Sequence, residues 1–144
     1  MRRAESAAPI NAIANHPSVR RYIGFLELGN VDFAPVIAGP GVLALISEGG
    51  AAIFVPCGDD SLEAHVMFLP HVRGAQVERV CRAMFDWLFA NTPCREVIGP
   101  CPIRNRAVVA LATRLGMKRR GIVSPPVPMS PFVLFSMTRA DWKR

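Results

Sequence analysis

The sequence lacks long hydrophobic runs, and this argues against a membrane-spanning helix. Its longest apolar stretches, such as residues 42–46, have the length of a strand, far below the roughly 20 residues that cross a bilayer. Two arginines follow the first methionine, but no continuous apolar segment follows them, so a secretory signal is not expected. We therefore expect a cytoplasmic protein with no membrane partner.

Metal-binding spacings are lacking as well. The four cysteines, Cys57, Cys81, Cys94 and Cys101, form no CxxC motif, and no paired histidine motif accompanies them. We expect no metal site, and free thiols rather than disulfides, although Cys94 and Cys101 flank a short predicted strand and could approach each other. Cys81 lies on the apolar face of a predicted helix and is interpreted as a small core residue.

Acidic and aromatic residues are few. There are 17 lysines and arginines against 11 aspartates and glutamates, which gives a net charge of +6 and invites a nucleic-acid interpretation. However, the basic residues are scattered along the chain, and most aromatic residues lie in core-like patterns rather than between the basic ones. We therefore expect no specific nucleic-acid partner, but a basic surface that attracts anionic ligands.

The chain is expected to form one domain covering residues 1–144, since 51% of its residues are apolar and its length suffices for a core. Residues 1–8 are predicted to be a frayed end, with no strand before the first helix, and the proline-rich residues 124–131 a surface loop. Residues 25–41 have no clear assignment. Periodicity and turn residues predict helices at 9–14, 17–22, 75–90 and 106–115, and strands at 42–47, 52–56, 61–68, 96–99, 117–123 and 132–137.

Residues 61–91 form the most informative stretch, a predicted strand followed by a tight turn and a long amphipathic helix. Leu62, Ala64, Val66 and Phe68 share one face of the strand, and Glu63, His65 and Met67 share the other. A strand that leads through a turn into a helix directs unpaired amides and the positive end of the helix dipole at one point. Such a junction suits an anionic ligand such as a pyrophosphate.

The second half of the chain resembles the GNAT N-acetyltransferase superfamily. The family signature at this junction is Pro-x-x-Arg-Gly-x-Gly-x-Gly/Ala, and Pro70, Arg73 and Gly74 match it, whereas Gln76 and Glu78 occupy the two later small positions. Further on, Asn105 and the Leu115-Gly116-Met117 ending fit the family frame, with Ala112 where a tyrosine usually stands. The resemblance covers roughly residues 42–137 in element order, and the opening INAIANHPSVRRYIG is similar to small phage- and prophage-encoded members.

The resemblance implies an α/β fold of the α+β kind: a mixed, mostly antiparallel central sheet flanked by helices, with a parallel pair of strands splayed around the cofactor cleft. It implies acetyl-CoA as co-substrate. Asn105 is also a predicted N-cap of its own helix, and both roles can hold together. The residues that the resemblance places at the cofactor are Phe68, Val72, Arg73, Gly74, Ala75, Gln76, Val77 and Asn105.

Acetyl transfer requires a base for the amine, and Glu63 or His65 is the candidate, although either could be an ordinary strand residue. The acid that a tyrosine usually supplies is missing at Ala112, and Tyr22, the only tyrosine, is interpreted as a packing residue. Glu78 would add negative charge near the phosphates. The resemblance therefore predicts an N-acetyltransferase for a small-molecule or peptide amine, possible as a homodimer, or alternatively a catalytically lapsed protein with a binding or structural role in a phage-related system.

Overall fold

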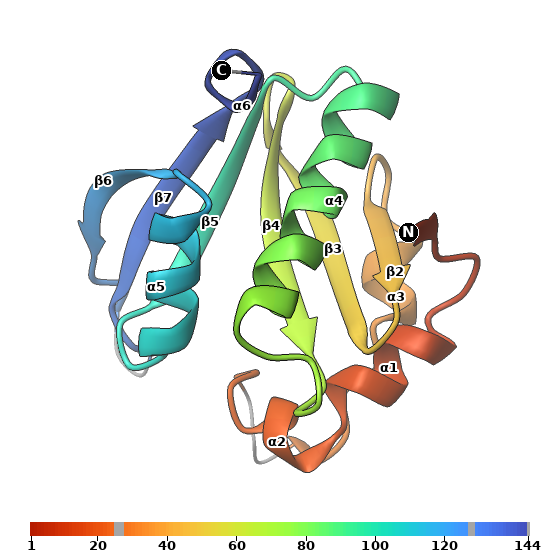
Figure 1. Ribbon diagram of the computed structural model, residues 1–144. Helices are drawn as coiled ribbons and strands as arrows, with labels where there is room; N and C mark the ends of the chain where they lie inside the picture. The colour runs from red at the N-terminus through yellow and green to blue at the C-terminus, as the bar shows by residue number, and fades with distance from the viewer. Residues whose placement is uncertain (25–27, 127–128, 144) are drawn as a thin grey trace.

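A seven-stranded sheet with helices on both faces makes up the protein. The computed structural model describes residues 1–24, 28–126 and 129–143 (Figure 1). The sheet order is β1-β2-β3-β4-β5-β7-β6, in which only β4 and β5 are parallel. The mixed, mostly antiparallel α/β fold is therefore confirmed. The strands are β1 (Arg2–Arg3), β2 (Leu43–Ser47), β3 (Gly50–Gly58), β4 (Ser61–Phe68), β5 (Glu96–Pro102), β6 (Lys118–Val123) and β7 (Phe132–Thr138).

Helices cover both faces of the sheet. Successive strand residues point to opposite sides, so a strand in which every residue is apolar needs a covering layer on each face. On β2, Leu45 packs with Met84 and Leu88 of α4, whereas the next residue, Ile46, packs with Ile10 of α1. Both faces of β2 and β3 are thus buried, which explains why these strands read as continuous apolar runs. The helices are α1 (Ala8–Ala14), α2 (Pro17–Arg20), α3 (Ala34–Ile37), α4 (Ala75–Asn91), α5 (Arg106–Arg114) and α6 (Arg139–Trp142).

The hairpin between β2 and β3 turns at Glu48 and Gly49, as the Gly-Gly pair predicted. Ser47 pairs with Gly50, and Gly49 has a φ of +66°, a conformation that residues with a side chain rarely adopt. Space forbids a side chain too, because a Cβ on Gly49 would lie 2.5 Å from Cγ2 of Val72. The hairpin turn therefore packs directly against the segment that leads into α4.

Helix α4 matches the predicted helix at 75–90 and carries the main core. Its buried side chains, among them Met84, Phe85 and Leu88, pack on β2, β3 and β5. Cys81 is buried on the same helix, and burial raises the pKa of its thiol to about 12, so it stays protonated. Its interpretation as a core residue is confirmed.

Several expectations about the ends of the chain were wrong. Residues 1–8 are not frayed, since Arg2 and Arg3 pair with β2 and the Ala4 amide donates to the Ala44 carbonyl at 2.8 Å. This first strand has only two residues, both exposed at the sheet edge, so the sequence contains no apolar alternation from which it could be predicted. β5 continues through Pro100 to Pro102, and α6 follows β7 unforeseen. Of the predicted loop at 124–131, residues 127–128 lie outside the described part, as do residues 25–27.

In the described ranges, no helix is long and apolar enough to span a membrane. Those residues also contain no group of three or more histidine, cysteine, aspartate or glutamate side chains that could hold a metal ion. The four cysteines are unpaired thiols.

Candidate functional site

A splay between β4 and β5 is the central feature of the site. The two strands pair in parallel at only three positions, from Ser61 with Glu96 to Glu63 with Ile98, and then diverge (Figure 1). Beyond Glu63 no described strand pairs with this edge of β4. Alternate amides and carbonyls along it are therefore open to an extended ligand.

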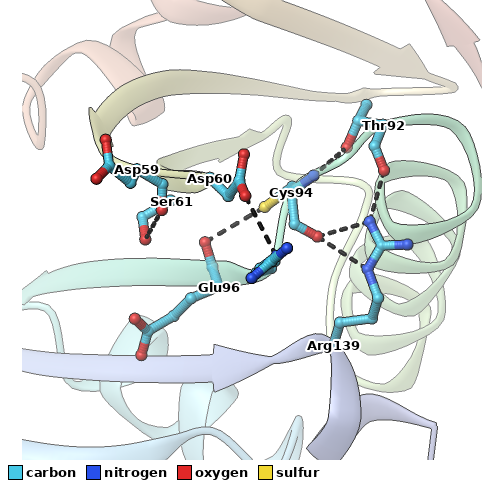
Figure 2. Close-up of polar contacts among 8 residues, drawn as sticks. Asp59, Asp60, Ser61, Thr92, Cys94, Glu96 and Arg139 are labelled. Carbon is cyan, nitrogen blue, oxygen red and sulfur yellow. Dashed lines mark hydrogen bonds and ion pairs between the residues drawn. The ribbon is translucent and has the colours of Figure 1, made fainter.

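The narrow end of the splay is fixed by a polar network (Figure 2). The Asp60 carbonyl accepts from the Arg95 amide at 2.7 Å, and its carboxylate lies 3.2 Å from Nε of Arg95. Arg139 donates to the carbonyls of Thr92 and Cys94, which ties the end of α4 to the start of α6. These contacts fix where β4 and β5 meet, so the part of the splay that a ligand can enter begins beyond the pair of Glu63 and Ile98.

The turn at the wide end leads from β4 into α4 and leaves donors open. The Val72 amide is used within the turn, donating to the Leu69 carbonyl at 3.0 Å, and the Gln76 amide donates to the Arg73 carbonyl at 3.2 Å. Gly74 is the N-cap residue, with φ of +59° and no side chain to cap the helix. The amides of residues 73–75 donate to no other described residue, and the Arg73 side chain is exposed beside them. Backbone donors, the helix dipole and one arginine thus meet at a single point.

Glu78 lies in the first turn of α4, where its charge would oppose an anion. Its Oε1 atom accepts from Nε and Nη2 of Arg82 at 3.1 and 2.9 Å, and its Oε2 atom lies 3.6 Å from Nε of Arg114. Arg82 also donates to the carbonyl of Arg114 at the end of α5. The carboxylate is therefore paired with two guanidinium groups between α4 and α5. Its spacing from Arg82 was readable from the sequence, but its contact with Arg114 was not.

Glu63 and His65 form a pair on the face of β4 opposite α4. Oε1 of Glu63 lies 2.7 Å from Nε2 of His65, and the side chains are 37% and 48% exposed. Across the ladder, Ile53 and Val55 of β3 belong to or border the core under the N-terminal helices, so the pair lies at the rim of that layer.

A third group faces this area. Burial raises the pKa of the Cys57 thiol, and the carboxylates of Glu63 and Glu96 raise it further. Glu96 pairs with Ser61 and therefore lies on the same face of the sheet as Glu63. The Oε1 atom of Glu96 lies 3.7 Å from Nη2 of Arg120. Glu63 and His65, the two candidate bases from the sequence, are in contact with each other.

The remaining predicted residues are placed as follows. Phe68 packs against the cluster of Cys81, Leu111 and Leu115, and its ring occupies the space beside Gly50. Asn105 caps α5 as predicted, its side chain accepting from the Val108 amide at 3.3 Å.

Neither position considered for a tyrosine is as expected from the family pattern or from the sequence. Ala112 is buried with Cys101 and Phe135, so it presents no polar group. Tyr22 is not the packing residue expected: it is 55% exposed, with the Arg21 guanidinium 4.9 Å from the centre of its ring. The short α2 ends at Arg20, which puts the Tyr22 ring outside the core.

No family model matches the sequence, and no curated protein matches it. Solved structures do match. Spermidine N-acetyltransferase from Vibrio cholerae, in complex with CoA and spermine, superposes with a TM-score of 0.78 at 12% identity, covering 99% of this chain and 96% of its own. An aminoglycoside acetyltransferase in complex with coenzyme A gives 0.72 at 16% identity, covering 95% and 91%.

These likenesses establish a shared fold. The chain therefore has the fold of the GNAT acetyltransferases, as its motifs predicted. The likeness of residues 10–24 to phage-encoded members stays a prediction.

Proposed function

We propose that this protein is an N-acetyltransferase that uses acetyl-CoA and acetylates a primary amine of a small molecule or peptide. The observation that carries the proposal is the uncapped N-terminus of α4 at the wide end of the splay, with its open amides and exposed Arg73. The GNAT fold supports it, because the two matched enzymes are described in complex with CoA.

The residues present fit the co-substrate. The amides of Arg73, Gly74 and Ala75 would hold the pyrophosphate, and the Arg73 side chain would add a charge-assisted contact. Glu78 does not prevent this, since two arginines pair with its carboxylate. The open edge of β4 beyond Glu63 would accept the amide-containing arm. Val77 and Phe68 would line the arm, whereas Asn105 acts as a helix cap. Acetyl-CoA supplies an activated acyl group; the chain has to bind it, orient it and manage a proton.

His65 is the base in this proposal, and Glu63 orients it. The short Nε2–Oε1 contact favours the tautomer with a proton on Nε2, which leaves the lone pair of Nδ1 to accept a proton from the amine. Glu63 then stabilises the charged imidazole. Because residue 112 is an alanine and has no acidic group, the acid that returns a proton to the departing thiolate is solvent water in this proposal.

Cationic amines suit this surface, since the partly exposed Glu63 carboxylate lies beside His65 on the open face of the sheet. The matched enzymes point the same way, as one is a spermidine N-acetyltransferase and the other an aminoglycoside acetyltransferase. We therefore propose an amine that is positively charged in solution as the acceptor.

Calorimetry with acetyl-CoA tests the proposal first. We expect binding in the micromolar range, and no heat at millimolar acetyl-CoA would overturn it. Thiol release with a panel of amines tests turnover, and His65→Gln should reduce kcat roughly 100-fold without changing acetyl-CoA affinity. The missing tyrosine at Ala112 favours the second candidate, a lapsed enzyme; tight CoA binding without thiol release from any amine would establish it.

A further inference from the structure

The narrow end of the splay contains a glycine and a methionine that belong together. β5 leaves β4 after Ile98, so Gly99 is the first residue at which the splay widens. A Cβ on Gly99 would lie 3.3 Å from Cε and 3.8 Å from Sδ of Met117. The end of the Met117 side chain therefore occupies space that any other residue at position 99 would claim.

Met117 lies between the core clusters of the two flanking helices. It packs with Val66 of β4 against Cys81, Leu111 and Leu115, and also with Ala112 and Phe135 on the α5 side. It thus fills the splay on the face covered by α4 and α5.

The backbone of Met117 is held in place by hydrogen bonds. Its amide donates to the Ala112 carbonyl at 3.0 Å, and the Gly116 amide donates to Thr113 at 3.0 Å, which together form a Schellman motif at the end of α5. The backbone is therefore fixed, whereas a methionine side chain has three rotatable bonds and adapts to irregular spaces. Met117 thus combines a fixed backbone with an adaptable side chain, and we call this side chain the plug.

The direction of the acyl group follows from the two ends of the site. An anion at residues 73–75 and a reacting carbon beside His65 require a ligand that runs along β4 toward the narrow end. His65 lies on the open face of the sheet, so the amine arrives from that side. On the face covered by α4 and α5, the splay next to this point is bordered by Gly99 and Met117, so an acyl tail that turns to this face meets them.

We infer that Gly99 and Met117 set the length of the acyl group that the protein accepts. This inference rests on the proposed function and adds to it: the Met117 side chain restricts the site to short acyl groups, and it can lie in this position because Gly99 has no side chain.

Two substitutions should change the acyl-length preference in opposite directions. Met117→Ala removes the plug, and we expect the ratio of butyryl-CoA to acetyl-CoA affinity to rise roughly tenfold. Gly99→Ala presses on the flexible end of Met117, and since Gly99 does not have a positive φ, alanine introduces no backbone strain. We expect this variant to lower the same ratio severalfold, and the double variant to return toward the wild-type value.

The readout is the calorimetric dissociation constant for CoA, acetyl-CoA and butyryl-CoA, with the thiol-release rate as a second measure. Met84→Ala, which removes a methionine from the core under α4, is the control and should leave the ratio unchanged. If Met117→Ala does not fold, Gly99→Ala decides alone. CoA binding with an unchanged ratio in the folded variants overturns this inference only. No binding of any CoA thioester to the wild type overturns the proposed function and, with it, this inference.

Discussion

The N-termini of α4 and α5 lie at the same end of the molecule and are built differently (Figure 1). Helix α5 is capped by its own chain, since the Asn105 side chain accepts from the Val108 amide. Helix α4 begins at Gly74, which has no side chain to cap it. A glycine at the N-cap stabilises a helix less than an asparagine does, by roughly a few tenths of a kcal/mol, so α4 loses only a little stability by leaving its amides open.

The difference is consistent with two tasks. A helix that needs only to fold satisfies its own amides, as α5 does. Helix α4 is held instead by tertiary contacts before it starts: the Leu69 amide donates to the Gly49 carbonyl at 2.8 Å, and Val72 is buried against the hairpin turn. The rigid support keeps the open amides in place without occupying them, as a site for an external anion requires.

The largest expected effect follows from reversing the charge at the open terminus. Arg73→Glu should weaken CoA binding roughly 100-fold, because it places a carboxylate beside the phosphates in place of a guanidinium. Arg106→Glu makes the same change in the first turn of α5 and is the matched control. Calorimetry on both variants measures the contrast, and equal losses in the two would contradict the assignment of the site to α4.

A substitution in the hairpin turn, outside α4 itself, should disrupt the contacts that support the open N-terminus of α4. Gly49→Ala combines an unfavourable φ with a Cβ 2.5 Å from Val72, so we expect a loss of about 2–4 kcal/mol in the free energy of unfolding. CoA affinity should fall in the molecules that stay folded. At the other end of β3, Gly58→Ala meets only Cβ of Ser61 at 3.8 Å and should be nearly neutral. Urea unfolding of both variants would show whether the hairpin turn supports α4.

The closed terminus offers a smaller effect of a different kind. Asn105→Ala should reduce the free energy of unfolding by about 1 kcal/mol and leave CoA affinity unchanged, because its side chain serves the Val108 amide. Asn105→Ser keeps a capping oxygen and should retain most of the stability. A drop in CoA affinity in both variants, with stability retained in the serine variant, would instead place Asn105 at the co-substrate, as the family resemblance suggested.

Local signals in the sequence were sufficient for most of the elements. The Gly49-Gly50 pair located the hairpin, and the apolar stripe through Cys81 and Leu88 located α4. β1 escaped because a two-residue edge strand has no periodicity, and its pairing depends on β2, more than 40 positions away. α6 escaped because its four residues are fixed by the Thr138 cap and by contacts to distant elements.

The candidate site was predictable only as a set of residues. The strand pattern placed Glu63 and His65 on one face, but not their 2.7 Å contact. The motif at Arg73 and Gly74 located the turn, whereas the internal use of the Val72 amide required backbone geometry. Met117 could not be connected with Gly99, because sheet pairing and the end of α5 together bring them into contact.

Glu78 should give the smallest effect on the open N-terminus of α4. It is the only acidic residue in the first turn of that helix. Its carboxylate is shared by Arg82 and Arg114, so Glu78→Gln should tighten CoA binding only about threefold, and less at high salt. Arg82→Gln removes one partner and should weaken binding by a similar factor. Calorimetry at two salt concentrations measures both. A gain above roughly 30-fold in Glu78→Gln would mean that the carboxylate turns toward the phosphates despite its partners. A loss of affinity would mean that the link between α4 and α5 positions the open terminus, and that α4 depends on α5 for more than packing.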